Sequence, residues 1–304
     1  MLRSGRLTAA KAGSGSNTVM DTRPSPIFVS HGSPMTALQP REAGAFMQRL
    51  GPAIDAAFGR PRAIVAVSAH TLSRAAALLA AARHEAVYDF GGFDAALYRL
   101  RYDAPGAPAL AAEAAALLHA AGFEAQTLAR GGLDHGLWTP LRYMWPAADV
   151  PVLPLAWAPE WSPRRLFDFG AALAPLTDRG VLVLGSGSIT HNLSRVFAGG
   201  LRDADREASA ESSAFRDWCA ERSGAGDWEA LFDYRRRAPH AALMHPTDEH
   251  LLPFFVAAGA AGPERATRLH ASLTYGELGM DAYAFGAGAA ALVQALAPAG
   301  ERPA

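Results

Sequence analysis

Cysteine is almost absent from this chain of 304 residues, because Cys219 is the single example. An intrachain disulfide and any cysteine-rich zinc or iron–sulfur site are therefore excluded. A chain that uses no disulfide suits a reducing compartment, so we expect a cytoplasmic protein. Cys219 lies in a helix-like stretch without a basic cluster to favour its thiolate, and we expect it to be a structural residue.

The sequence also has no excess of one charge and no long apolar run. Its 28 basic residues nearly balance 29 acidic ones, which gives no electrostatic reason to expect nucleic acid or an anionic membrane as a partner. The longest apolar stretches are rich in alanine and are broken by charge or proline. None reaches the roughly 20 residues that a membrane span needs.

The N-terminal residues 1–25 are poor in apolar side chains, so we expect a flexible tail there, and Met20 could be the natural start. They contain no apolar segment typical of a secretory signal; a basic transit-like peptide is the alternative. No internal linker divides the remainder of the chain. We expect one catalytic domain over residues 26–296 and a short C-terminal tail over residues 297–304.

Three segments share one pattern, in which an apolar, strand-like run ends at a loop that carries a histidine. The runs that begin at residues 27, 63 and 181 lead to His31, His70 and His191. The carboxyl ends of parallel strands in an open α/β sheet form one rim, where ligands bind. We therefore expect an α/β fold in which histidines distant in sequence converge on a metal ion.

Apolar periodicity and capping residues predict the other elements. Ser162 followed by Pro163 is a typical helix start. Residues 75–82 fit a strand or a short helix, and residues 88–94, with paired glycines and aromatics, fit a shaped loop. The further predictions are helices over 41–58, 109–121, 162–176, 205–220 and 228–237, strands over 126–129, 150–156 and 270–274, and a closing alanine-rich segment over 283–295.

Ten histidines are present, and six of them stand in loop-forming contexts, after a strand or near a helix start. Neutral imidazole is the commonest transition-metal ligand, and a site with few carboxylates and no thiolates suits iron(II) or zinc rather than magnesium or calcium. His31 and His70 are the first candidate ligands. We expect no functional role for the four histidines without such a context, which are His84, His119, His240 and His270.

His245 and His250 are five residues apart, too far for one face of a single helix turn, so we expect one of them to coordinate. Thr247 is the predicted cap of a helix that would hold His250 about one turn inside. His245 instead precedes Pro246 in extended backbone. These differences favour His250.

His191 could be a ligand or a general acid and base, since the unperturbed pKa of histidine is about 6.5. His135 follows Asp134 in a glycine-rich loop and could be oriented by that carboxylate or by the loop itself. Both are candidate active-site residues.

Five ordered motifs between about residues 26 and 292 resemble one family. The chain is similar to the DODA-type branch of the class III, LigB-like extradiol aromatic ring-opening dioxygenases in His31-Gly-Ser-Pro, Ser68-Ala-His70, Asp134-His135-Gly, Thr190-His191-Asn-Leu and Pro246-Thr-Asp-Glu-His250-Leu-Leu-Pro. One departure is Thr71, where many relatives have an aromatic residue. It bears on substrate choice more than on chemistry.

The resemblance implies a single-domain α/β fold with a mixed central sheet flanked by helices. It also implies a mononuclear non-haem iron(II), often found replaced by zinc, that opens a small catechol such as DOPA with O2 in a monomer or small homo-oligomer. The roles that it implies are metal ligation by His31, His70 and His250, base catalysis by His191, which is also a possible fourth ligand, and contact with substrate or dioxygen by His135.

Three aromatic side chains, Phe90, Phe93 and Trp138, are expected to exclude water from such a site. Two alternatives use the same histidines. A zinc-bound hydroxide could hydrolyse an amide or ester, or the chain could be a non-catalytic scaffold with a metal pocket.

Overall fold

The computed structural model of the chain describes residues 23–198 and 204–298. The predicted tails, residues 1–25 and 297–304, lie largely outside this part of the chain, as does Met20. Ser25 is described and buried, and its hydroxyl donates a hydrogen bond to the carbonyl of Phe285 at 2.7 Å. The chain is therefore packed against its neighbours from Ser25 onward.

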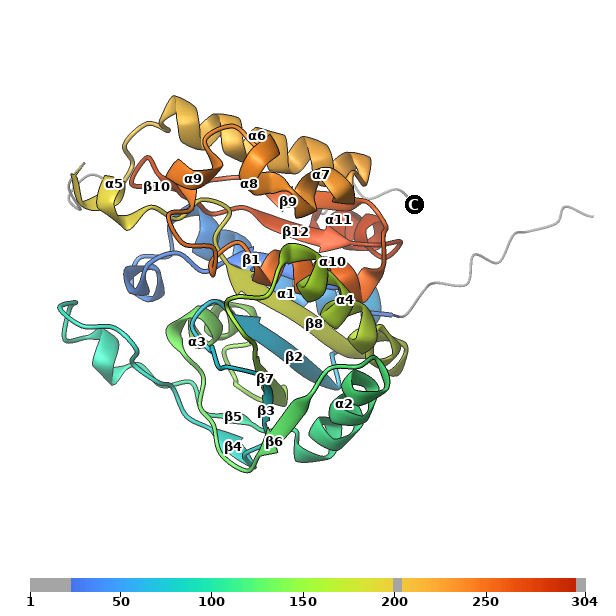
Figure 1. Ribbon diagram of the computed structural model, residues 1–304. Coiled ribbons are helices and arrows are strands. Elements are labelled where there is room, and N and C mark those ends of the chain that lie inside the picture. Colours follow the sequence, from blue (N-terminus) through green and yellow to red (C-terminus); the bar gives the residue numbers. More distant parts are fainter. Residues whose placement is uncertain (1–22, 199–203, 299–304) are drawn as a thin grey trace, which may run out of the picture.

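An eight-stranded mixed sheet forms the centre of the molecule (Figure 1). The four middle strands are parallel neighbours, and antiparallel pairs occur only toward the two edges of this sheet. The predicted α/β class with a mixed sheet is confirmed. In spatial order the strands are β6 (Ala125–Leu128), β3 (Ala76–Leu79), β7 (Val152–Ala156), β2 (Ala63–Ser68), β8 (Val181–Gly187), β1 (Ile27–Ser30), β12 (Ala282–Phe285) and β9 (Ala266–His270).

Helices cover both faces of this sheet (Figure 1). Alternation along β1 shows how the two buried cores form, since Ile27 and Val29 contribute to one core and Phe28 to the other. One face carries α1 (Arg41–Phe58), α3 (His135–Met144) and α11 (Ala289–Leu296), and the other carries α2 (Pro108–Ala120), α4 (Pro163–Leu173), α6 (Ala210–Ala225) and α10 (Pro253–Ala261).

Short elements complete the described chain. Two pairs of two-residue strands form small separate sheets. These are β4 (Arg83–His84) with β5 (Ala104–Pro105), and β10 (Leu273–Thr274) with β11 (Leu278–Gly279). The short helices are η1 (Pro34–Ala37), η2 (Leu97–Arg99), η3 (Ala174–Arg179), α5 (Leu193–Ala198), α7 (Trp228–Phe232), α8 (Tyr234–Arg237) and α9 (Ala241–Met244).

Strong local signals gave correct elements. The helix predicted over 41–58 is α1, which ends at Gly59 with a positive φ of 82°. Ser162 caps α4 as predicted, because its hydroxyl accepts a hydrogen bond from the amide of Arg165 at 3.2 Å. Of the two possibilities for residues 75–82, the strand is present as β3.

Weaker signals gave wrong boundaries. The helix predicted from residue 205 begins at Ala210, because Ser209 caps it through the amide of Ser212 at 3.1 Å. The helix predicted over 228–237 is interrupted at Asp233, between α7 and α8. The strand predicted over 270–274 is also wrong, since β9 ends at His270 and β10 pairs with β11. Residues 283–295 divide between β12 and α11.

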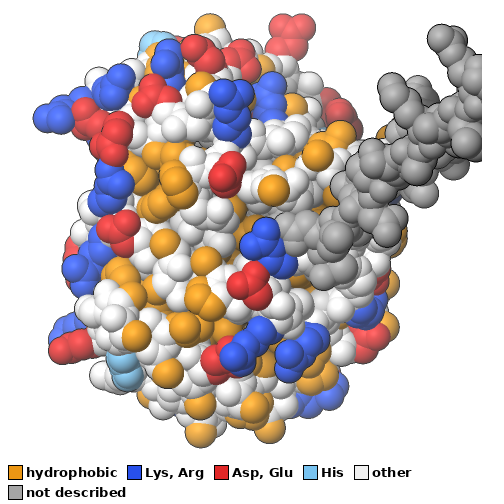
Figure 2. Space-filling model, turned by 90° about the vertical axis from the view of Figure 1, so that its right-hand side faces the viewer, with side chains coloured by type: hydrophobic (Ala, Val, Ile, Leu, Met, Phe, Trp, Pro, Cys, Tyr) orange, Lys and Arg blue, Asp and Glu red, His pale blue; other side chains and the backbone are white. Residues whose placement is uncertain are grey.

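The surface carries charges of both signs. Figure 2 shows the right-hand side of Figure 1, where basic and acidic side chains are interspersed among scattered apolar atoms. This face has no broad area of one sign, in keeping with the net charge of −1. Within residues 23–198 and 204–298, no helix combines the length and apolarity needed to cross a bilayer.

Candidate active site

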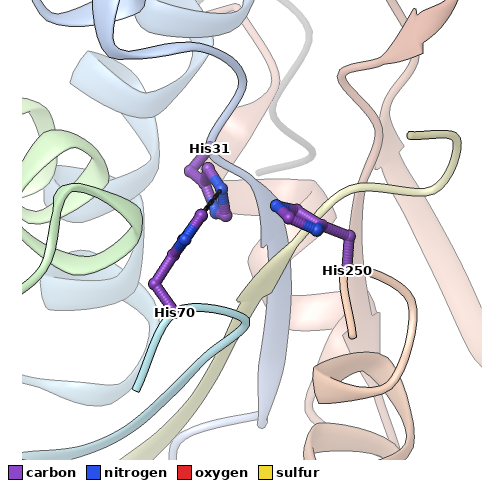
Figure 3. Close-up of side chains that lie close together, drawn as sticks. All are labelled: His31, His70 and His250. Carbon is purple, nitrogen blue, oxygen red and sulfur yellow. Dashed lines mark hydrogen bonds between the residues drawn. The ribbon is translucent and has the colours of Figure 1, made fainter. Parts of the chain in front are cut away.

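Three histidines from separate loops meet beyond the carboxyl ends of the central strands. His31 follows β1, His70 follows β2, and His250 lies in the turn before α10. Their imidazoles point toward one another (Figure 3), and the Nε2 atoms of His31 and His70 are 3.2 Å apart. The ring centroid of His250 lies 5.5 Å from that of His31 and 4.9 Å from that of His70. One nitrogen from each ring lies within 4.8 Å of the others, so one ion can reach all three.

The backbone of the loop after β8 holds His250, because the amide of Ser188 donates to the carbonyl of His250 at 2.8 Å. Gly187 makes this approach possible, since a Cβ atom there would lie 2.0 Å from the same carbonyl oxygen. The prediction that His250 lies one turn inside a helix capped by Thr247 is wrong, because α10 starts at Pro253. The close approach of two backbones replaces the predicted helix in fixing this side chain.

The proton on His31 can be placed from its hydrogen bonds. Nδ1 of His31 lies 3.0 Å from the hydroxyl oxygen of Ser186. That hydroxyl donates its own proton to the carbonyl of Gly136, so it accepts from His31. Nδ1 of His31 therefore carries a proton, and its Nε2 presents a lone pair to the other two rings.

In the other two rings, Nδ1 faces a carboxylate. Nδ1 of His250 lies 3.1 Å from Glu249 Oε1, and Nδ1 of His70 lies 3.5 Å from Asp89 Oδ2. A carboxylate accepts but does not donate, so it favours a proton on the Nδ1 that faces it. Histidines that bind metals usually donate their second ring nitrogen to such a partner. The arrangement leaves the Nε2 atoms available.

Burial keeps these imidazoles uncharged. Burial, followed by the neighbouring His70, holds the pKa of His31 well below 6.5, and burial followed by His191 does the same to the pKa of His250. Burial and His135 also lower the pKa of His70. Neutral imidazole is the form that binds a transition metal, and protonated rings this close would repel one another. The three nitrogens therefore fit a metal such as iron(II) or zinc.

His135 begins α3 beside this cluster, and Asp89 orients it. Nδ1 of His135 lies 3.0 Å from both carboxylate oxygens of Asp89, and its backbone amide donates to Oδ1 at 2.9 Å. Burial opposes ionisation of Asp89, but the hydrogen bond from His135 leaves its pKa below the ordinary value. Asp89 stands in no motif of the sequence that points to a site. Its one signal was its place in the shaped loop over residues 88–94.

Asp134 bonds the loop that carries His70, whereas the sequence had suggested that it could orient His135. Its carboxylate accepts hydrogen bonds from the hydroxyls of Ser68, at 2.7 Å, and of Thr71. These two residues flank His70 in the sequence. Asp134 therefore ties the start of α3 to the loop that carries His70, and Thr71, the departure from the family motif, supplies one of the two bonds.

His191 stacks on His250 at the edge of the cluster. The two ring centroids are 3.4 Å apart and the planes are within 8° of parallel. Burial, followed by His245, lowers the pKa of His191 to about 3. One ring nitrogen of His191 lies within 4.8 Å of possible metal-ligand atoms of Glu249 and His250. These three residues form a set separate from the one that contains His31.

Comparison with known proteins supports the family suggested by the motifs. A family model described as the catalytic LigB subunit of aromatic ring-opening dioxygenase matches residues 25–286. The chain belongs to this family. LigB-family membership and the relatives described next identify it as a metal-dependent extradiol ring-opening dioxygenase.

Two curated relatives of this LigB-family chain are named 4,5-DOPA dioxygenase extradiol. The one from Beta vulgaris is 36% identical over 85% of this chain and 95% of its own length. The one from Escherichia coli (strain K12) is 34% identical over 79% of this chain and 86% of its own. The crystal structure of an uncharacterized protein from Escherichia coli K12 superposes with a TM-score of 0.69 and 27% identity, covering 87% of this chain and 100% of that one. The comparisons support ring opening over the hydrolase and scaffold alternatives.

A cavity of about 880 Å³ opens in front of the histidines of this LigB-family site. His70, His135, His191 and His250 line it, together with Phe90 and Phe93 among other residues. Trp138, which was expected to exclude water there, is fully buried, and its indole nitrogen donates to the carbonyl of Val87 at 3.0 Å. Trp138 packs behind Phe90, with ring centroids 6.3 Å apart.

His245 supports the site from behind. It is fully buried, and its Nε2 donates to the carbonyl of Ile189 at 2.7 Å, while the amide of His191 donates to the carbonyl of Met244 at 2.9 Å. These two bonds join the loop after β8 to the segment that leads to His250. His245 therefore positions His191 and His250 relative to each other.

Protonation of His245 should destabilise the fold below pH 6.5. Burial lowers the pKa of His245 to about 4, against about 6.5 in an unfolded chain, so the unfolded state binds the additional proton between these values. The contribution of neutral His245 to the free energy of unfolding is complete above pH 6.5. It falls by about 3 kcal/mol as the pH is lowered toward 4. We expect the metal-free His245→Gln protein to lose less stability than the wild type between pH 7 and 4.5 in urea unfolding. Equal losses would contradict this role.

The four histidines without a predicted role lie outside the cluster. His119 bonds the carbonyl of Ala125 at 3.0 Å, and His270 stacks on Phe46 with centroids 4.7 Å apart. His84 is buried in β4, and His240 is exposed before α9. Cys219 is buried in α6, as expected of a structural residue, and burial raises the pKa of its thiol.

Proposed function

We propose that this LigB-family enzyme opens the ring of a catechol with O2, using a ferrous ion held by His31, His70 and His250. The observation that carries the proposal is the convergence of three neutral imidazoles whose Nδ1 atoms face other partners. When bound, the ion supplies Lewis acidity toward the diol and a place for dioxygen beside it. The relatives named for 4,5-DOPA, itself a catechol, support this substrate class.

We assign proton transfer to His191. Burial holds the pKa of His191 low, so its ring is unprotonated at neutral pH. Its place in the lining of the cavity allows it to receive the proton that a diol hydroxyl releases on binding. Its ring lies against His250 and lines the cavity. Its donor atom is not grouped with those of His31 and His70, which favours proton transfer over a role as fourth ligand.

We assign a second role in proton transfer to His135, with Asp89 as its hydrogen-bond partner. The carboxylate fixes a proton on Nδ1 of His135, so Nε2 is the nitrogen left for the cavity. His135 can therefore take up a proton during the reaction and return it to the opened product.

Replacing Asp89 with asparagine should lower kcat by about 10- to 100-fold while iron content after reconstitution stays close to stoichiometric. The amide keeps the shape of the side chain but loses the charge and one of the two acceptor oxygens that face His135. Oxygen uptake and metal analysis measure the two effects. Asp149→Asn, an exposed change in an ion pair with Arg60, is the matched control and should leave both unchanged.

The proposed function is tested by reconstitution without oxygen. Protein loaded with iron(II) under nitrogen is mixed with catechol or DOPA, and oxygen is then admitted. We expect oxygen consumption with a coloured ring-opened product, and weaker or no turnover with the zinc form. Ester hydrolysis by the zinc form without oxygen uptake, or no reaction with any diol, would contradict the proposal.

A further inference from the structure

We propose that the preferred substrate is a catechol with an extended apolar substituent and no carboxylate, an inference that rests on the proposed function. The evidence is the wall of the cavity beyond the histidines. A dry cavity of about 150 Å³ is enough for benzene. A cavity of about 880 Å³ therefore has room for much more than a bare catechol ring.

The wall of this cavity that lies away from the clustered histidines is mainly apolar. Phe90 and Phe93 come from the shaped loop between β4 and β5, and their ring centroids are 5.6 Å apart. Phe90 also meets His135 edge-on, with centroids 5.6 Å apart and planes at 90°. A substrate ring held near His135 would therefore lie beside aromatic side chains, which favour apolar groups.

Apolar side chains are also exposed at the mouth of the cavity. Leu72, Leu193 and Phe197 line it, and their exposed fractions are 38%, 43% and 58%. Leu193 and Phe197 belong to α5, which lies on the same side of the molecule as the loops that follow β1 and β2 (Figure 1). Such grouped exposure of large apolar residues marks a binding surface. An apolar substituent that extended out to this mouth would cover them.

The charge of the wall argues against an anionic substituent. Asp94 and Glu249 border the cavity, whereas no arginine or lysine of the described residues does. The carboxylate of Asp94 is held by the amide of Ala96 at 2.7 Å, and Glu249 bonds His250. Proteins usually bind carboxylates through arginine or lysine. A substrate carboxylate would lose its hydration and meet like charges instead.

A matched pair of substrates tests the inference. Methyl 3-(3,4-dihydroxyphenyl)propanoate and its free acid differ at the end of the substituent by a charge and a methyl group. We expect kcat/KM for the ester to exceed that for the acid by about tenfold or more, mainly through KM. We also expect the ester to exceed 4-methylcatechol. Equal values for ester and acid, or a preference for the acid, would overturn the inference even though ring opening itself was observed.

Variants at the mouth of the cavity supply an internal control. Leu72→Arg adds a positive charge there and should raise the ratio of acid to ester turnover by about tenfold. Asp94→Asn removes a negative charge and should raise the same ratio by about threefold. The ratio cancels differences in folding and metal loading. Val293→Arg places the same charge on α11, outside the lining of the cavity, and should leave the ratio unchanged. An unchanged ratio in Leu72→Arg would contradict the proposal, and failure to open any diol would instead refute the proposed function.

Discussion

Replacing His70 with alanine should remove bound iron and lower kcat/KM by at least about a thousandfold. The Nε2 of His70 lies 3.2 Å from that of His31, so the change removes one of three proposed ligands and leaves an incomplete site. Without the metal, the protein has no Lewis acid to activate the diol. Metal analysis after anaerobic loading and gel filtration, together with oxygen uptake, measures the two losses.

His70 is the best of the three positions for this test because its side chain is 24% exposed, whereas His31 and His250 are almost fully buried. A truncation there leaves a smaller internal cavity and costs less folding free energy. His119→Gln, on the exposed side of α2, is the control and should keep both iron and turnover. Stoichiometric iron in His70→Ala would remove His70 from the ligand set.

Replacing His191 with alanine should leave iron bound and lower kcat by about 10²- to 10⁴-fold, the usual contribution of a general acid or base. Its ring stacks on His250 but its donor atom is not grouped with those of His31 and His70. The diol would then have to release its proton to water. Iron content and single-turnover oxygen uptake separate binding from chemistry.

His191→Gln provides a second variant that retains a polar side chain of similar reach but cannot carry the proton. We expect it to bind iron as the wild type does and to be as slow as His191→Ala. Loss of iron in both His191 variants to the extent seen in His70→Ala would mean that His191 is a ligand. Turnover within threefold of the wild type in either variant would remove it from proton transfer.

The placement of His31, His70 and His191 at one rim could be predicted because it follows from the sheet. β2, β8 and β1 are adjacent parallel strands, and each of these histidines follows the carboxyl end of one of them. Strand-like runs with a polar exit are strong local signals, and parallel strands bring their exits to one rim. The sequence therefore carried most of the information needed to place these three side chains.

His250 and Asp89 show where local reasoning stops. His250, and not His245, lies in the cluster with His31 and His70, but contact with the loop after β8 fixes it and not the helix that was predicted. Asp89 reaches His135 from a loop 46 residues earlier in the chain. Nothing in the spacing of the sequence indicates that contact. Partners of this kind arise from the packing of loops, which local patterns do not encode.

The most direct test of the account is the position of the iron. Crystals of the protein loaded with iron(II) without oxygen would show the ion as an anomalous difference peak at the iron absorption edge. We predict one peak at about 2 Å from the Nε2 atoms of His31, His70 and His250, in keeping with metal–imidazole bonds. A peak held by other residues, or no peak in protein that contains stoichiometric iron, would contradict the three-histidine site.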